Sequence, residues 1–239
     1  MKIVTNPKLI ARNAKIGLWG QIAGFILLLG AAWLSFQSVQ WLGLSLILFA
    51  FGVIFSQIGK YFGNRWSRRP RSDEHLDKSL KGLDRNYTLY HYRSPIAHLL
   101  IGPAGIWILL TRALKGKISY IKSKDRWKHR GGGALFRLFG QEGLGRPDLD
   151  FKTDILKIEK MLSTKLNIEP PPRVNAVLIF TNEDIQIDTQ DSLHPAVRAN
   201  QLKKFIRKQV KVQHLSDVVI HEINDLLTPN QIINKTSPE

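Results

Sequence analysis

The sequence predicts an α/β (α+β) protein in which a two-helix transmembrane hairpin precedes a mixed sheet flanked by helices. Three observations carry this prediction. Residues 16–59 contain no charged side chain. Short β-branched and aromatic runs lie between Pro95 and Tyr120, and a long amphipathic stretch begins at Pro147. The 239 residues suffice for one domain with a proper core plus extra segments.

The uncharged stretch divides into two spans, 16–34 and 41–59, each close to the roughly 20 residues that a helix needs to cross the hydrocarbon core. Two spans in succession do not fit a cleaved signal peptide. A buried helical hairpin in a soluble protein is the alternative, and the uninterrupted apolarity argues against it. Gly20 and Gly24 have the spacing that lets membrane helices approach closely, within the hairpin or between copies.

The orientation of the hairpin follows from the basic residues at its two ends. These are Lys2, Lys8, Arg12 and Lys15 before it, and Lys60, Arg65, Arg68, Arg69 and Arg71 after it. The loop between the spans has no basic residue. The positive-inside rule therefore predicts a multi-pass protein of the inner or plasma membrane with both termini in the cytoplasm. We divide the chain into an N-terminal segment (1–15), the hairpin (16–59), a basic tether (60–71), a folded domain (72–210), and a C-terminal helix and tail (211–239).

Charge and cysteine content narrow the function. The chain has no cysteine, which excludes disulfides and thiolate metal sites. Its net charge is +16, and residues 64–239 hold 30 Lys and Arg against all 19 carboxylates, or 30 − 19 = +11. Such a balance favours nucleic acid or an anionic membrane surface as a partner. The alternative is positive-inside bias together with an ordinary solvated surface.

The centre of the folded domain is predicted at two apolar runs, 96–101 and 106–111, which flank the turn sequence Gly-Pro-Ala-Gly. Because both runs are apolar almost throughout, helices should cover both faces of their sheet. Further strands are predicted at 87–92, 117–122, 174–180 and 196–199. Helices are predicted at 72–83, 147–166, 200–208 and 216–227.

The same stretch carries a resemblance to a known family. His98, the turn Gly102 to Gly105, the strand start at Ile106 and Gly116 fall in register with a family pattern. Residues 72–210 thereby resemble the nuclease-related domain, NERD, of the restriction-endonuclease-like superfamily. The resemblance implies a restriction-endonuclease-like mixed sheet. It also implies that the family's metal-binding Asp and Glu and its Lys correspond to Ala97, Leu110 and Arg112.

These three replacements predict a domain that binds phosphate without cutting it. Ala97 and Leu110 offer no oxygen to Mg²⁺, and a guanidinium clamps phosphate instead of activating water. We therefore expect no catalytic residues, no metal and no cofactor. The candidate polyanion-binding residues are Arg112, Lys115, Lys117, Lys122, Lys124, Arg126, Lys128 and Arg130.

Residues 112–137 are the most basic region of the chain, and Trp127, Phe136 and Phe139 lie within it or just after it. Beyond the strand predicted at 117–122, this region is interpreted as a flexible basic loop. Such a loop can follow a DNA or RNA backbone and stack bases, or lie on the anionic lipid of the inner leaflet with its Phe residues inserted. A mobile surface loop whose apolar residues fold back on the domain is the third reading.

Two other functions stay open at this stage. The first is a Mg²⁺-dependent nuclease with a relocated site that uses Glu74, Asp84 or Asp148. The second is a membrane scaffold that meets a protein partner, whose identity the sequence does not give. His91 and His98, on neighbouring predicted strands, are expected to be packed and hydrogen-bonded, not metal ligands.

Overall fold

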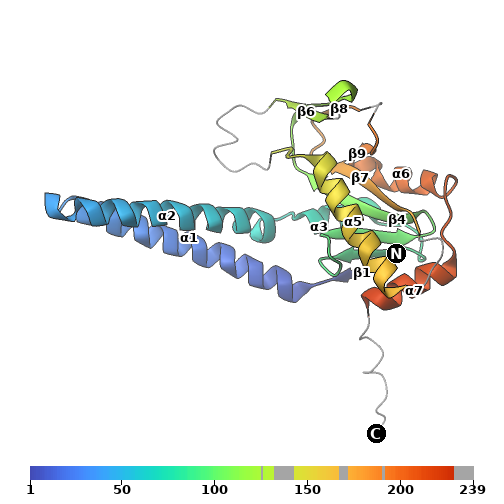
Figure 1. The fold of residues 1–239 in the computed structure, drawn as a ribbon, viewed down its shortest axis with the longest axis horizontal. Helices are drawn as coiled ribbons and strands as arrows, with labels where there is room; N and C mark the ends of the chain where they lie inside the picture. Colours follow the sequence, from blue (N-terminus) through green and yellow to red (C-terminus); the bar gives the residue numbers. More distant parts are fainter. Residues whose placement is uncertain (125, 132–142, 167–171, 190–191, 229–239) are drawn as a thin grey trace, which may run out of the picture. The chain divides into compact units, whose positions relative to one another are not determined.

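The computed structural model describes residues 1–124, 126–131, 143–166, 172–189 and 192–228. The chain divides into two compact units, one made of Met1–Thr5 and His75–Glu239 and the other of Asn6–Glu74. The second unit is thus an insertion. The chain leaves the first unit after Thr5 and returns to it at His75. Figure 1 labels α1 and α2 of the inserted unit and several strands and helices of the other unit.

The inserted unit is a hairpin of two long helices, α1 (Pro7–Ser35) and α2 (Leu42–Phe62). A 3-10 turn (Val39–Trp41) joins them, and a π-helical turn (Gly63–Ser67) follows α2. Both helices are long and apolar enough to cross a membrane. α1 begins at residue 7 and not at 16, because the Asn6 side chain accepts a hydrogen bond from the Leu9 N–H and caps the helix there.

Glycines form the contact between the two helices. A Cβ added at Gly20 would lie 2.9 Å from the Cα of Gly59, and one added at Gly24 would lie 2.6 Å from the backbone nitrogen of Ser56. Near the loop, the Ser45 hydroxyl donates a hydrogen bond of 2.8 Å to the carbonyl of Ala31. The Gly20 and Gly24 pair is therefore used inside the hairpin, one of the two uses expected from its spacing.

The first unit contains a six-stranded mixed sheet in the order β1-β2-β3-β4-β7-β9. Its strands are β1 (Lys2–Thr5), β2 (Thr88–His91), β3 (His98–Gly102), β4 (Gly105–Arg112), β7 (Val174–Phe180) and β9 (Ala196–Arg198). β3 is antiparallel to β2 and β4, and the other neighbouring pairs are parallel. Gly105 closes the β3–β4 turn with a φ of 97°, a conformation that glycine adopts without strain.

Helices cover both faces of this sheet, as the apolar runs predict. The helices are α3 (Ser72–Leu80), α5 (Pro147–Lys165), α6 (Leu202–Gln209) and α7 (Asp217–Leu227). One face packs Leu99 and Ile101 against α5 and α7, through Phe151 and Ile223 among others. The opposite face packs alternate residues, such as Leu100 and Trp107, against α3 and α6. Figure 1 shows α5 crossing the sheet.

A second, three-stranded sheet has the order β6-β5-β8. Its strands are β5 (Gly116–Ile121), β6 (Arg126–Arg130) and β8 (Ile185–Asp188). β6 pairs antiparallel with β5, and β8 pairs parallel with it. The sequence predicts β5 as part of a single sheet, no strand at β1 or β8, and a flexible loop at β6. For residues 126–130 the loop interpretation is wrong, because Arg-Trp-Lys-His-Arg alternates between two faces of a strand. Phe136 and Phe139 lie outside the described residues.

Candidate polyanion-binding face

The three-stranded sheet separates its cationic and apolar side chains onto opposite faces. Its register sets Lys117 opposite Arg130, Ser119 opposite Lys128, and Ile121 opposite Arg126. Residues that are directly opposite in neighbouring strands point to the same side, and alternate residues along a strand do so too. Lys117, Arg126, Lys128 and Arg130 therefore share one side, and all four are exposed. We call these four residues the basic face.

The other side of the sheet is apolar and buried. Ile118 is 0% exposed and Trp127 is 6% exposed. The Trp127 ring meets Tyr120 edge-on, with 5.5 Å between the ring centroids. The expectation that Trp127 stacks on bases is therefore wrong, because the strand alternation turns this ring into the core while its neighbours Arg126 and Lys128 face solvent.

The basic face is little neutralised by carboxylates. The Lys117 ammonium lies 3.2 Å from the Asp188 carboxylate, an exposed pair of small net benefit. Arg126, Lys128 and Arg130 make no ion pair within the described residues. They follow one another at every second position of β6, which spaces them by about 7 Å. The strand thus holds a straight row of three uncompensated cations.

Other candidate cations lie near this sheet but outside its basic face. Lys115 precedes β5, is exposed, and lies 3.6 Å from the Asp184 carboxylate. Lys122 and Lys124 belong to the 3-10 turn Lys122–Lys124 that leads from β5 toward β6. Lys122 is exposed and directly follows Ile121, which lies opposite Arg126 at that end of the sheet.

Arg112 has a different environment from the other candidates. At the end of β4, its Nη2 donates to the Asp150 carboxylate at 2.6 Å. Its Nε donates to the Leu144 carbonyl at 3.3 Å, and its Nη1 donates to the Thr111 carbonyl at 3.0 Å. These bonds join β4 to the start of α5. They occupy N–H groups of the guanidinium that a phosphate would need. We therefore leave Arg112 out of the basic face.

The two positions that the resemblance equates with metal-binding carboxylates, Ala97 and Leu110, carry apolar side chains. The β3–β4 register pairs Leu99 with Ile108. Ala97 directly precedes β3, and Leu110, in β4, packs against the buried core. No three His, Asp or Glu side chains come together as possible metal ligands within the part of the chain that the structure describes.

The three carboxylates considered for a relocated site have other surroundings. Glu74 pairs with Arg71 at 3.2 Å, and Asp148 lies 3.3 Å from Arg146. Asp84 is exposed, and its carbonyl accepts the Tyr87 N–H at 3.2 Å. Glu74 also belongs to the inserted unit, whereas Asp84 and Asp148 belong to the sheet unit.

A buried histidine pair lies at the end of β2 and β3. His91 and His98 are cross-strand partners, and their Nδ1 atoms are 2.8 Å apart. The His91 Nε2 lies 3.0 Å from Asp77 on α3. Since a carboxylate only accepts, His91 carries its proton on Nε2, and a neutral His91 then accepts at Nδ1 from the His98 N–H. The expectation that both histidines are packed and hydrogen-bonded is confirmed, whereas their bond to each other and the contact with Asp77 were not predicted.

The backbone next to this pair is unusual. Tyr92 has a φ of 57°, although it is not glycine, and its N–H donates to the Ala97 carbonyl at 2.8 Å. Its ring lies 5.1 Å from the ring of His98. The pair is therefore enclosed by Tyr92 as well as by α3.

Comparison of the chain with models of protein families, with curated proteins and with solved structures finds no match. The architecture therefore defines the class of protein. It is a mixed α/β domain, with one six-stranded and one three-stranded sheet, into whose chain a pair of long apolar helices is inserted.

Proposed function

We propose that this protein is a membrane-anchored, non-catalytic domain that binds nucleic acid through the phosphates, using its basic face. The observation that carries the proposal is the row of Arg126, Lys128 and Arg130 on one exposed strand face, without carboxylate partners in the described structure. Contacts of this kind neutralise phosphates, release counterions and read no sequence.

The basic face also limits the mode of binding. Trp127 and Tyr120 lie on the opposite, packed side of the sheet, so the basic face offers no ring from β5 or β6 on which a base could stack. Backbone contact alone therefore fits the geometry, and we expect DNA and RNA of any sequence to bind with similar affinity at equal length and charge.

The anchor in this proposal is the α1–α2 hairpin. Because β1 pairs with β2, the residues before α1 and those after α2 belong to one folded unit. A folded unit cannot be divided by a bilayer, so the two ends of a spanning hairpin lie on one side. The basic flanks assign that side to the cytoplasm and make the protein a multi-pass protein of the inner or plasma membrane.

The absence of catalysis rests on Ala97, Leu110 and Arg112. The first two give no oxygen ligand for Mg²⁺, and the third is held by Asp150. The resemblance to the nuclease-related domain supports a phosphate-binding ancestry for the fold, and no metal or cofactor belongs to the proposal.

The test is a binding experiment on the full chain in nanodiscs of zwitterionic lipid. We expect it to retain duplex DNA, duplex RNA and single-stranded DNA at low ionic strength, to release them as salt rises, and to leave them uncut with Mg²⁺ or Mn²⁺. No binding at low ionic strength would remove the proposal. Failure to bind nucleic acid, combined with binding to vesicles of anionic lipid, would replace it with the lipid-facing alternative. Metal-dependent cutting abolished by Glu74→Gln, Asp84→Asn or Asp148→Asn would establish the relocated nuclease.

A further inference from the structure

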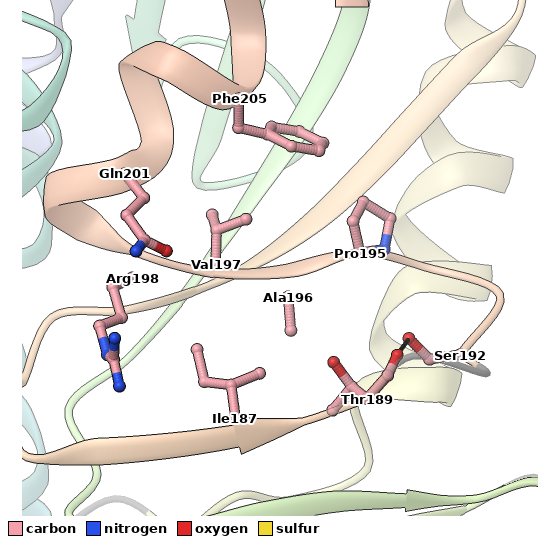
Figure 2. Close-up of a pocket in the computed structure, with 9 residues that line it drawn as sticks. All are labelled: Ile187, Thr189, Ser192, Pro195, Ala196, Val197, Arg198, Gln201 and Phe205. Carbon is pink, nitrogen blue, oxygen red and sulfur yellow. Dashed lines mark hydrogen bonds between the residues drawn. The ribbon is translucent and has the colours of Figure 1, made fainter. Parts of the chain in front are cut away.

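A cavity of about 550 Å³ lies beside β8, β9 and the start of α6, away from the basic face. Its volume falls in the range of small-molecule sites. In Figure 2 its side chains are ordered by polarity. Arg198 and Gln201 lie at one end, Thr189 and Ser192 at the other, and Ala196 and Ile187 between them, whereas Val197 points to the other side of β9, toward Phe205. An elongated ligand with an apolar body would match this order.

Arg198 is the one charged residue among the nine that line the cavity. Its Nε and Nη2 both donate to the Ile185 carbonyl, at 3.1 and 2.7 Å. This carbonyl fixes the guanidinium across the gap between β9 and β8 but does not cancel its charge. No carboxylate of the described residues lies within 4 Å of Arg198. Its remaining N–H groups have the fork geometry that binds an oxyanion.

We propose that this cavity binds a small organic anion, an apolar group that bears one carboxylate or phosphate. The oxyanion meets Arg198 and Gln201, and the apolar body lies along Ala196 and Ile187, which share the Arg198 side of β9. This site is separate from the basic face, since Ile187 alternates with Gln186 and Asp188 along β8 and so points to the packed side of the three-stranded sheet.

The test uses three probes of similar shape with the full chain in nanodiscs of zwitterionic lipid, with empty nanodiscs as the blank. 2-Naphthoate and 2-naphthyl phosphate carry the two oxyanions, and 2-naphthalenemethanol carries none. We expect at least one anion to bind with a Kd below about 1 mM, and the alcohol to bind at least about tenfold more weakly. Which anion binds more tightly identifies the oxyanion.

Two variants locate the site. Arg198→Gln should weaken binding of the anion about tenfold or more, whereas Arg126→Gln, on the basic face, should leave it unchanged. The proposal is overturned if neither anion binds, if the alcohol binds as well as the anions, or if folded Arg198→Gln keeps the wild-type affinity. It is also overturned if Arg126→Gln loses as much as Arg198→Gln. The comparison of anion and alcohol needs only the wild-type chain and decides the matter even where Arg198→Gln does not fold.

Discussion

The guanidinium group has three different environments in Arg112, Arg126 and Arg198. Asp150 neutralises Arg112, the Ile185 carbonyl holds Arg198 without neutralising it, and Arg126 faces solvent without an ion pair in the described structure. A carboxylate partner makes an arginine structural, while an uncompensated charge leaves it able to bind an anion. The sequence places Arg112 first among the phosphate-binding candidates because of the resemblance. The structure shows why Arg126 is better suited.

The histidine pair gives a prediction about paired polar groups in the core. His91 is 0% exposed and His98 is 4% exposed, and each satisfies the other. His91→Leu should lower the free energy of unfolding by about 2 kcal/mol, because it leaves the His98 Nδ1 buried without its partner. The double change to His91→Leu and His98→Leu should cost less than the sum of the single changes.

The measurement is a double-mutant cycle from urea unfolding in detergent micelles, followed by tryptophan fluorescence. A coupling of about 1 kcal/mol or more is the expected result. Strictly additive effects would contradict the hydrogen bond between the two rings.

Tyr90 makes the attachment of α7 sensitive to alkaline pH. Its hydroxyl donates to Asn224 on α7 at 2.8 Å, and burial raises its pKa above the ordinary value of 10.0. The folded state therefore holds this proton more tightly than the unfolded state does. The resulting stability is fully present below about pH 10 and is lost as pH rises through the folded-state pKa.

Tyr90→Phe should consequently reduce the loss of thermal stability between about pH 9 and about pH 11. A part of the loss should remain, because burial also raises the pKa of Tyr87. Tyr61→Phe, at an exposed position of α2, should behave as wild type. Parallel pH profiles for wild type and Tyr90→Phe would show that this hydroxyl does not govern the transition.

At the scale of elements, the hairpin depends on small residues at the contact between its helices. Gly24→Leu should separate α1 from α2, because even its Cβ would lie 2.6 Å from the Ser56 nitrogen, and overpacking of this kind costs about 1–3 kcal/mol. Gly30→Leu is the matched control in the same helix, since nothing lies within 4 Å of a Cβ added at Gly30.

The chain has no cysteine, so a disulfide can report this contact without interference. Ala31→Cys with Ser45→Cys should form one, as the Ser45 hydroxyl reaches the Ala31 carbonyl at 2.8 Å. Gly24→Leu should lower the yield of the disulfide, and Gly30→Leu should not. Equal yields in both backgrounds would show that the glycines are not needed for the contact.

The elements that the sequence predicts are those whose signal is local. The apolar runs of β3, β4 and β7, the periodic α5 that begins at Pro147, and the periodic α7 capped by Ser216 each show their own pattern over several residues. β1 is different, because its four residues are a strand only through pairing with β2, more than 80 residues away. No local pattern contains that partner.

The residues of the candidate site could be predicted from the sequence, but the strand that arranges them could not. The charges of Arg126, Lys128 and Arg130 predict that they bind a polyanion. A flexible loop was predicted for these residues, whereas they alternate along strand β6. The pattern was present, since Trp127 and His129 fall between the cations. Asp77 and the cavity at Arg198 could not be predicted, because both depend on which helices and strands pack together.

At the scale of the whole molecule, the insertion of the hairpin into the sheet unit predicts the membrane topology. Lys2→Cys in β1 and Lys203→Cys in α6 belong to one unit and should react from the same side of sealed vesicles with a membrane-impermeant maleimide. Gln37→Cys, in the exposed loop between α1 and α2, should react from the other side. Labelling of Lys2→Cys and Lys203→Cys from opposite sides would exclude a spanning hairpin.

The basic face acts at this same scale, because binding of phosphates depends on charges that work together. The triple variant Arg126→Gln, Lys128→Gln and Arg130→Gln removes three charges from it. Lys152→Gln, Lys160→Gln and Lys165→Gln remove three exposed charges from α5 and serve as the matched control of equal net charge.

The decisive measurement is the slope of log K against log salt for mixed-sequence duplex DNA, with the full chain in nanodiscs of zwitterionic lipid. Each phosphate contact contributes about 0.9 to the slope, so the basic-face variant should be flatter than wild type by about 2.7. The α5 variant should run parallel to wild type. If the basic-face variant keeps the wild-type slope, then Arg126, Lys128 and Arg130 do not touch phosphate, and the proposed function is wrong.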